Sequence, residues 1–278
     1  MNAVNSIMNP LFDAVFAVLG VFSPAAALLV FSAIAGVVMM VIFRHTSSQS
    51  ALKAVADRTR AGLLAMLLFK DDLNVTLRSL WNMFKASGMR LLYSLPPLLV
   101  LVVPFTLILS QLGARYGFRP LKIGEDARVE LRVAADVWDA ARNVVLETPD
   151  AVAVETPGVR DAHDHTITWR VRPRAGGMHT LTWRIGDRVI QKRLAVDDGS
   201  SGLQAISVMR PGSSLWDRVL HPAEPALDDG SGVRSITLYY DWARSTPLFG
   251  YDVHWLVTFL VGSIVFGLLA RPVLKVQI

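Results

Sequence analysis

Three long charge-free stretches stand out in the pattern of apolar and polar positions along the chain. They cover residues 25–43, 91–112 and 253–270. An α-helix rises about 1.5 Å per residue and the hydrocarbon core of a bilayer is about 30 Å thick, so roughly 20 apolar residues cross it. We therefore predict three transmembrane helices at these positions.

A shorter apolar stretch, residues 10–22, precedes the first predicted span. Asp13 lies inside it, and Ser23-Pro24 separates it from the span. No Lys or Arg precedes it, whereas a cleaved signal peptide begins with a basic region. We therefore predict that residues 1–24 form an interfacial or re-entrant helix.

Residues 44–90, between the first two spans, have the pattern of amphipathic helices. Apolar residues recur at helical spacing in the second half of this arm, and Lys and Arg flank them. The candidate contacts with lipid or a partner are Lys70, Leu77, Arg78, Trp81, Phe84 and Lys85. Two arrangements stay open. The arm forms a helical hairpin with a turn near 69–72, or its second helix lies on the membrane surface with its basic residues at anionic headgroups.

Residues 113–252 change to the alternation that is typical of half-buried strands. The predicted strands are 127–133, 143–147, 151–155, 166–172, 178–185, 188–196, 204–209 and 235–240. Residues 174–177 and Gly186-Asp187 are predicted hairpin turns, and residues 214–220 a short helix. Short strands at this spacing predict an immunoglobulin-like β-sandwich. Since the chain has no Cys, Trp169 and Trp183 have to fill its core by packing.

The predicted fold class is thus a membrane α + β protein whose β-sandwich is inserted between spans two and three. The predicted order is an interfacial or re-entrant helix (1–24), span one (25–43), a cytoplasmic helical arm (44–90), span two (91–112), an extracytoplasmic sandwich (113–252), span three (253–270) and a cytoplasmic tail (271–278).

Polar and small residues within the spans indicate how the spans pack. Pro96, Pro97 and Pro104 predict kinks in span two, and a kinked helix either opens a groove for a guest segment or reflects its own packing. The candidate groove residues are Arg44, Ser94, Thr106, Ser110 and Gln111. The pairs Ser32/Gly36 and Ser263/Gly267 allow close contact between helices.

Composition agrees with a membrane protein and excludes several classes. The 278 residues are 52% hydrophobic and 18% charged, with a mean hydropathy of +0.40. Soluble domains carry about a quarter charged residues. The absence of Cys excludes a disulfide scaffold, an iron–sulfur protein, a Cys-ligated zinc site and a thiol enzyme.

The distribution of charge predicts the orientation. Residues 44–90 hold eight basic and three acidic residues, whereas residues 113–252 hold 18 and 19. Short basic loops stay in the cytoplasm. We therefore expect the N-terminus outside, the arm and the C-terminus inside, and a bacterial inner (cytoplasmic) membrane as the location.

No motif marks catalytic or cofactor chemistry. The chain has no Gly-x-Ser-x-Gly elbow, phosphate-binding loop or His-Glu-x-x-His helix. His163-Asp164-His165 supplies metal-binding groups, but a site needs further ligands from elsewhere. We expect a non-enzymatic protein without metal or cofactor. Its expected partners are the lipid bilayer and an unidentified protein, with neither nucleic acid nor a small-molecule substrate.

The order of parts in residues 25–112 and 253–278 resembles the three-helix core of the YidC/Oxa-type membrane insertase superfamily. That resemblance implies a membrane groove and a cytoplasmic arm that receive hydrophobic client segments. Bacterial insertases of this type place a basic residue inside the groove, and the nearest one here is Arg44 at the membrane edge. Phe43-Arg44-His45-Thr46-Ser47 also resembles a segment of an uncharacterised bacterial membrane-protein group, which implies no function.

Two functions follow as hypotheses. The first is a scaffold or assembly subunit that binds a partner through the sandwich, the arm or both. It predicts an exposed apolar patch on the sandwich and stable co-purification of the partner. The second is an insertase-like or chaperone-like protein, which predicts a lipid-open polar groove lined by Ser94, Thr106, Ser110 and Gln111.

Overall fold

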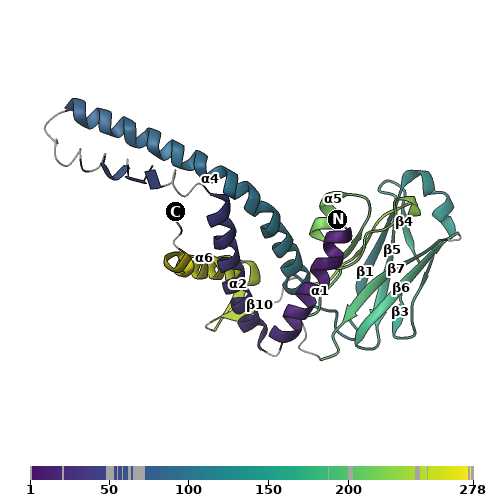
Figure 1. The fold of residues 1–278 in the computed structure, drawn as a ribbon. Coiled ribbons are helices and arrows are strands. Elements are labelled where there is room, and N and C mark those ends of the chain that lie inside the picture. The colour runs from purple at the N-terminus through teal and green to yellow at the C-terminus, as the bar shows by residue number, and fades with distance from the viewer. Residues whose placement is uncertain are drawn as a thin grey trace. The chain divides into compact units, whose positions relative to one another are not determined.

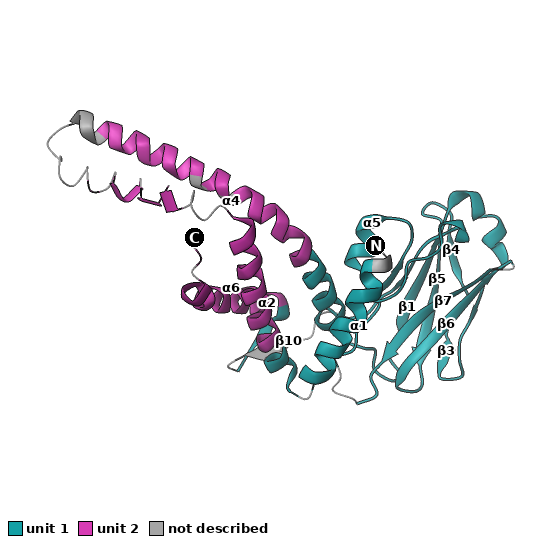
Figure 2. Ribbon diagram, viewed as in Figure 1, with its two compact units in different colours: residues 1–27, 106–255 teal, residues 28–105, 256–278 magenta. Residues whose placement is uncertain are grey.

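The chain divides into two compact units, which Figure 2 colours separately. Unit 1 consists of residues 1–27 and 106–255, and unit 2 of residues 28–105 and 256–278. The computed structural model describes residues 2–20, 22–47, 73–186, 188–199, 203–241, 245–248, 250–274 and 276, together with scattered residues between 53 and 64.

Among the residues that the structure describes, three helices are long and apolar enough to cross a membrane (Figure 1). They are α2 (Pro24–Thr46), α4 (Leu73–Tyr116) and α6 (Trp255–Leu274). Helices α2 and α4 contain the stretches 25–43 and 91–112, and α6 contains residues 255–270 of the third stretch. The prediction of three such helices is confirmed, but span three was placed two residues too early, because Val253 and His254 belong to a strand (Tyr251–His254).

Helix α4 joins the second half of the arm to the second span without a break. Its 44 residues correspond to about 66 Å at 1.5 Å per residue, roughly twice the hydrocarbon thickness. The domain boundary that we placed after residue 90 is therefore not marked by an end of the helix. The turn that we expected near 69–72 lies outside the described residues.

Small residues bring α2 and α6 into close contact within unit 2. A Cβ on Gly36 would overlap the backbone oxygen of Ser263, and a Cβ on Gly262 would lie 3.0 Å from the Cβ of Ser32. A Cβ on Gly267 would lie 3.2 Å from the backbone oxygen of Gly36. The small-residue pairs in the sequence therefore mark the line along which the two backbones meet.

Unit 1 contains two open antiparallel sheets and a separate hairpin. In the larger sheet the strand order is β3-β5-β1-β9-β8, and β4 also pairs with β5; the smaller sheet is β2-β6-β7. The larger sheet has β1 (Ala127–Val133), β3 (Val152–Val154), β4 (Val159–Asp161), β5 (Thr166–Pro173), β8 (Met209–Pro211) and β9 (Val233–Leu238). The smaller sheet has β2 (Val145–Glu147), β6 (Gly177–Ile185) and β7 (Arg188–Val196).

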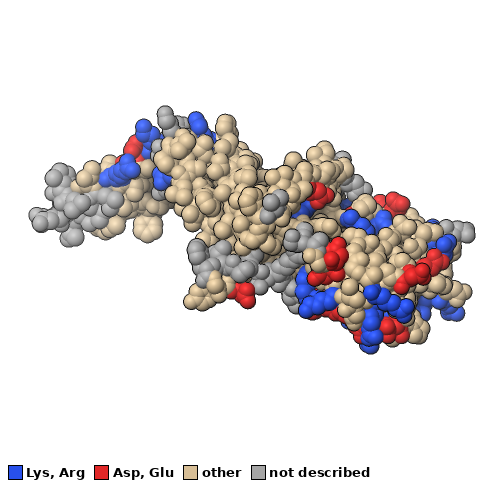
Figure 3. Space-filling model, turned by 90° about the horizontal axis from the view of Figure 1, so that it is seen from below, with Lys and Arg blue, Asp and Glu red and all other residues tan. Residues whose placement is uncertain are grey.

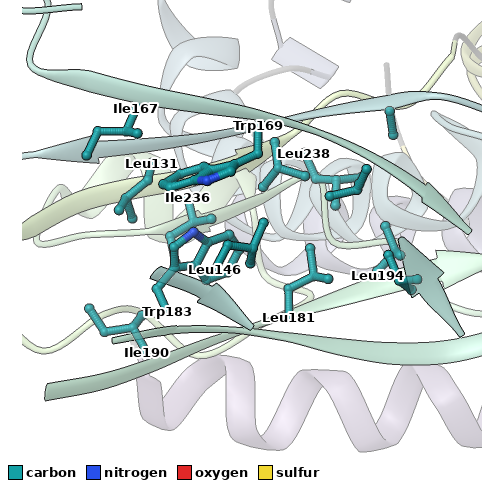
Figure 4. Close-up of a cluster of buried hydrophobic side chains, with 14 of the residues drawn as sticks. Leu131, Leu146, Ile167, Trp169, Leu181, Trp183, Ile190, Leu194, Ile236 and Leu238 are labelled. Atoms are coloured by element: carbon teal, nitrogen blue, oxygen red, sulfur yellow. The ribbon is translucent and has the colours of Figure 1, made fainter. Parts of the chain in front are cut away.

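The hydrophobic core of unit 1 lies between these two sheets (Figure 4). Trp169 of β5 and Trp183 of β6 are both buried, and their rings meet edge to face with centroids 6.2 Å apart. Alternate residues of β1 and β6 supply the surrounding aliphatic side chains, as period-two patterning requires. The predicted packing role of the two Trp residues is confirmed.

Helices and a hairpin complete unit 1. They are α1 (Asn2–Leu19), α5 (Leu215–Leu220), the hairpin β10 (Ser245–Leu248) and β11 (Tyr251–His254), and the short 3₁₀ helices at Ala135–Val137, Ala140–Asn143 and Asp229–Ser231. The predicted helix at 214–220 is confirmed as α5. The side chain of Ser214 caps it by accepting a hydrogen bond from the Asp217 N–H.

Two strand-level predictions are wrong. Residues 204–209 are not a strand, because pairing begins only at Met209, opposite Thr237. Residues 174–177 do not close a hairpin, because β5 and β6 belong to different sheets. A Cβ on Gly176 would lie 2.8 Å from the Asp198 Cα, so the chain crosses here against the end of β7. The turn at Gly186 does connect a hairpin, with Ile185 opposite Arg188.

Candidate functional site

The first half of α4 carries an exposed apolar stripe, defined here as Leu77, Leu80, Trp81 and Phe84. The exposed fractions of Leu77, Trp81 and Phe84 are 63%, 62% and 74%. Ser79 and Ala86, which lie on the opposite side of the helix, are buried. The stripe is therefore the face that the described chain leaves uncovered.

Basic side chains accompany this stripe, as the sequence indicated. The Lys85 ammonium lies 5.5 Å from the centre of the Trp81 ring, within the range of a cation–π interaction. Arg78 is exposed on the same helix. Lys70 lies outside the described residues. Five of the six candidate contact residues thus belong to one continuous helical segment.

The candidate groove residues are divided between the two units, and Thr106 and Ser110 line one hollow within unit 1. Arg44 is exposed in the last turn of α2 and belongs to unit 2, whereas Thr106, Ser110 and Gln111 belong to unit 1. Ser110 and Gln111 are buried. Ser110 donates a hydrogen bond to the Leu107 carbonyl, and Gln111 donates one to Asn9 at 2.6 Å. The side chain of Ser94 lies outside the described residues.

Unit 2 instead contains an apolar hollow between α2, α4 and α6. Its volume is about 420 Å³. Its wall residues are Gly36, Met39, Met40, Phe43, Leu98, Leu101, Val102, Phe105, Ser263, Ile264, Gly267 and Leu268. Only Ser263 among them has a polar side chain, and its hydroxyl donates to the Leu260 carbonyl. The hollow therefore presents an almost entirely apolar wall to any occupant.

A polar network, which the sequence did not reveal, joins α1 to the last turns of α4 in unit 1. Arg115 is almost completely buried, and its guanidinium donates to the Asp13 carboxylate and, at 2.8 Å, to the Gln111 side chain. The guanidinium carbon also lies 5.8 Å from the ring centre of Phe12 and 5.3 Å from that of Phe16, within the range of a cation–π interaction. Asp13, which the sequence shows only as a charge within an apolar stretch, is the counter-charge of a buried cation.

Replacement of Asp13 by Asn is expected to loosen α1. The buried Arg115 guanidinium would lose its anionic partner, and an uncompensated buried charge costs about 1–3 kcal/mol or more. Limited proteolysis should then cleave before residue 20 faster than in the parent chain. An equal cleavage rate in the two proteins would contradict this role for Asp13. Asp197→Asn, on an exposed turn, is the matched control and should change nothing.

A second missed cluster is buried between β7 and two loops of unit 1. The Lys192 ammonium donates to the Ser207 hydroxyl at 2.7 Å and to the Glu224 carboxylate at 2.7 Å, and Ser207 also donates to Glu224. All three residues are buried. Burial lowers the pKa of Lys192 to about 8, although Glu224 opposes that change. Burial by itself would raise the pKa of Glu224, but Lys192 and Ser207 together hold it below its usual value.

A Lys beside a Ser hydroxyl is also the arrangement of some serine hydrolases, in which a neutral Lys takes the proton. Here the Glu224 carboxylate pairs with Lys192 and favours its protonated form, and the Ser207 hydroxyl donates to Glu224 rather than to the Lys192 nitrogen. The cluster is therefore suited to holding the segments around Ser207 and Glu224 against β7.

Charged side chains are unevenly distributed over the molecule. On the face drawn in Figure 3, Lys, Arg, Asp and Glu gather over the β-strand region and over the outer end of the helices, and the remaining helical surface is almost free of them. His165 packs edge-on against Trp138. Among the described residues, no group of three His, Asp or Glu side chains is placed to hold a metal ion.

Comparisons of the chain with models of known protein families, with curated proteins and with solved structures find no match.

Proposed function

We propose that the protein is a non-enzymatic integral membrane scaffold or assembly subunit that binds a partner protein through its cytoplasmic arm. In this proposal α2, α4 and α6 cross a bacterial inner membrane, with the N-terminus outside and the C-terminus inside. The basic residues between the first two spans support this orientation. The two sheets of unit 1 then form an extracytoplasmic sandwich of immunoglobulin type, which the facing Trp169 and Trp183 support.

The exposed stripe on α4 carries the proposal. Trp81 and Phe84 are large aromatic side chains, and aromatic residues are enriched at the energetic centres of interfaces. Ser79 and Ala86 show that the other side of the helix is already covered. An apolar stripe with flanking cations fits an amphipathic or acidic helix of a partner, which would lay its own apolar face on the stripe.

Photo-crosslinking in native membranes tests this proposal. A benzophenone amino acid at Trp81 should give one constant protein adduct, identified by mass spectrometry. The same probe at Asn82, which is exposed on the adjoining side of the helix, is the matched control and should give much less of that adduct. Adducts with lipid alone, or equal adducts at both positions, would contradict a partner on the stripe.

The apolar hollow of unit 2 favours a second candidate, an insertase-like or chaperone-like protein. Its wall includes Met39, Met40 and Phe43, and flexible Met side chains adapt to varied apolar surfaces. A probe at Leu101 in this wall should then crosslink to many different newly made membrane proteins. Adducts with lipid alone at Leu101 would count against this function.

A further inference from the structure

We infer that α1 and α5 of unit 1 are inserted side by side into one leaflet of the bilayer, so that part of the β-strand unit is itself embedded in lipid. This inference rests on the proposed membrane placement of α4 and goes beyond it, because it assigns a lipid-binding surface outside the three spans.

The depth of α1 follows from its contacts with α4. Asn9 bonds Gln111 and Asp13 pairs with Arg115, and both pairs are separated by 102 residues. The two helices therefore run parallel, with each turn of α1 beside the turn of α4 that is 102 residues later. The charge-free stretch of α4 ends at Arg115. The residues of α1 before Asp13 consequently lie beside turns of α4 that belong to that stretch.

The outward face of α1 is apolar. Val4, Ile7, Leu11 and Val18 are exposed and follow one side of the helix. Phe12 and Phe16 occupy the opposite side and are buried. A helix that buries one apolar face against the protein and exposes a second apolar face is unusual in water. In a bilayer, the second face can contact lipid acyl chains.

Helix α5 reaches the same depth. The Asn5 side chain donates to the Arg218 carbonyl and the Asn9 side chain to the Pro222 carbonyl, so α5 lies beside the part of α1 that precedes Asp13. Independently, Leu220 lines a hollow of about 380 Å³ with Thr106 and Leu109 of α4. Both observations place α5 at the level of the charge-free stretch.

The exposed surface of α5 reverses the pattern of a solvated helix. Leu215 and Trp216 are 67% and 70% exposed, and Leu220 is also exposed. The two charged residues of α5, Asp217 and Arg218, are both only partly exposed. The Arg218 guanidinium donates to the Gly212 carbonyl and to Asp229. Trp at this depth is typical of the membrane interface. The lipid acyl region is the occupant that fits an apolar surface at the level of a spanning helix.

Depth-dependent quenching tests the inference on the full chain, which has no Cys of its own. A fluorophore is attached to single Cys variants at Ile7, Trp216 and Leu220 in vesicles of phosphatidylethanolamine and phosphatidylglycerol. Lipids with a nitroxide on the acyl chain should reduce the fluorescence about twofold, as they do at Val102, an exposed residue of the charge-free stretch of α4. Val159 and Val189, exposed on β4 and β7, are matched controls that aqueous iodide should quench instead.

The labelled positions distinguish a failure of this inference from a failure of the proposed membrane placement. Quenching at Val102 together with iodide quenching at Trp216 and Ile7 would overturn the inference and leave the membrane placement standing. Protection of Trp216 and Ile7 from both quenchers would show that protein covers them, which also overturns the inference. No lipid quenching at Val102 would overturn the proposed spanning of α4, and the inference with it.

Discussion

Replacement of Lys192 by Met is expected to reduce the free energy of unfolding of unit 1 by about 3–5 kcal/mol. The Met side chain fills a similar volume, but the Glu224 carboxylate would remain buried without its cation. That carboxylate also connects two loops to β7. Glu224, in one loop, accepts hydrogen bonds from Ser207 in the other loop and from the Arg193 N–H in β7. Chemical unfolding followed by Trp fluorescence measures the loss, since Trp169 and Trp183 report on the core.

A second substitution separates charge from packing in this experiment. In the variant with Lys192→Met and Glu224→Gln, no buried charge remains in this cluster and the Gln oxygen still accepts from the Arg193 N–H. Most of the lost stability should therefore return. Arg188→Met, on an exposed position of the same strand, is the control and should stay within about 0.5 kcal/mol of the parent. A double variant as unstable as Lys192→Met would contradict the role of the unpaired charge.

The same pair predicts a dependence on pH. The pKa of Glu224 is lower in the folded protein than in the unfolded chain, so the unfolded chain binds more protons as the pH falls. The contribution of Glu224 to stability is therefore fully present above its usual pKa and is lost as the pH falls through its folded value. Between neutral and acid pH, the parent should lose more stability than the double variant.

Replacement of Gly36 by Leu is expected to separate α2 from α6 and to destabilise unit 2 by about 2 kcal/mol or more. Even a Cβ at this position overlaps the backbone oxygen of Ser263, and backbone atoms cannot rotate away as a side chain does. Unfolding of the purified protein in mixed micelles with increasing dodecyl sulfate measures the change.

Gly88 supplies the matched control for this prediction. It lies in helix α4, and a Cβ added to it meets no atom within 4 Å. Gly88→Ala should be neutral or stabilising by up to about 1 kcal/mol, because Ala favours a helix over Gly. Gly36→Ala should be destabilising although the substitution is the same. Equal effects of the two Ala variants would show that α2 and α6 do not depend on close contact at Gly36.

Local periodicity by itself determined much of this protein. The three apolar helices, the short helix α5, the hairpin at Gly186 and the boundaries of β1 and β7 follow from residues close together in the sequence. Helical and strand patterns have different periods, so composition and spacing suffice to tell them apart. The pairs Ser32/Gly36 and Ser263/Gly267 likewise predicted where helices approach.

Only the tertiary structure decided which distant residues meet. Asp13 and Arg115 are 102 residues apart, and Lys192 and Glu224 are 32 residues apart. Nothing local distinguishes these charges from solvated ones, because burial is imposed by the packing of other elements. The crossing at Gly176 was also decided by the tertiary structure. The turn-like sequence at residues 174–177 does not specify whether β5 and β6 pair with each other or join different sheets. The sequence thus determined the apolar segments and most of the helices and longer strands. Packing decided the short strands β4, β10 and β11, which charges are buried, and which apolar faces of α1, α4 and α5 remain uncovered.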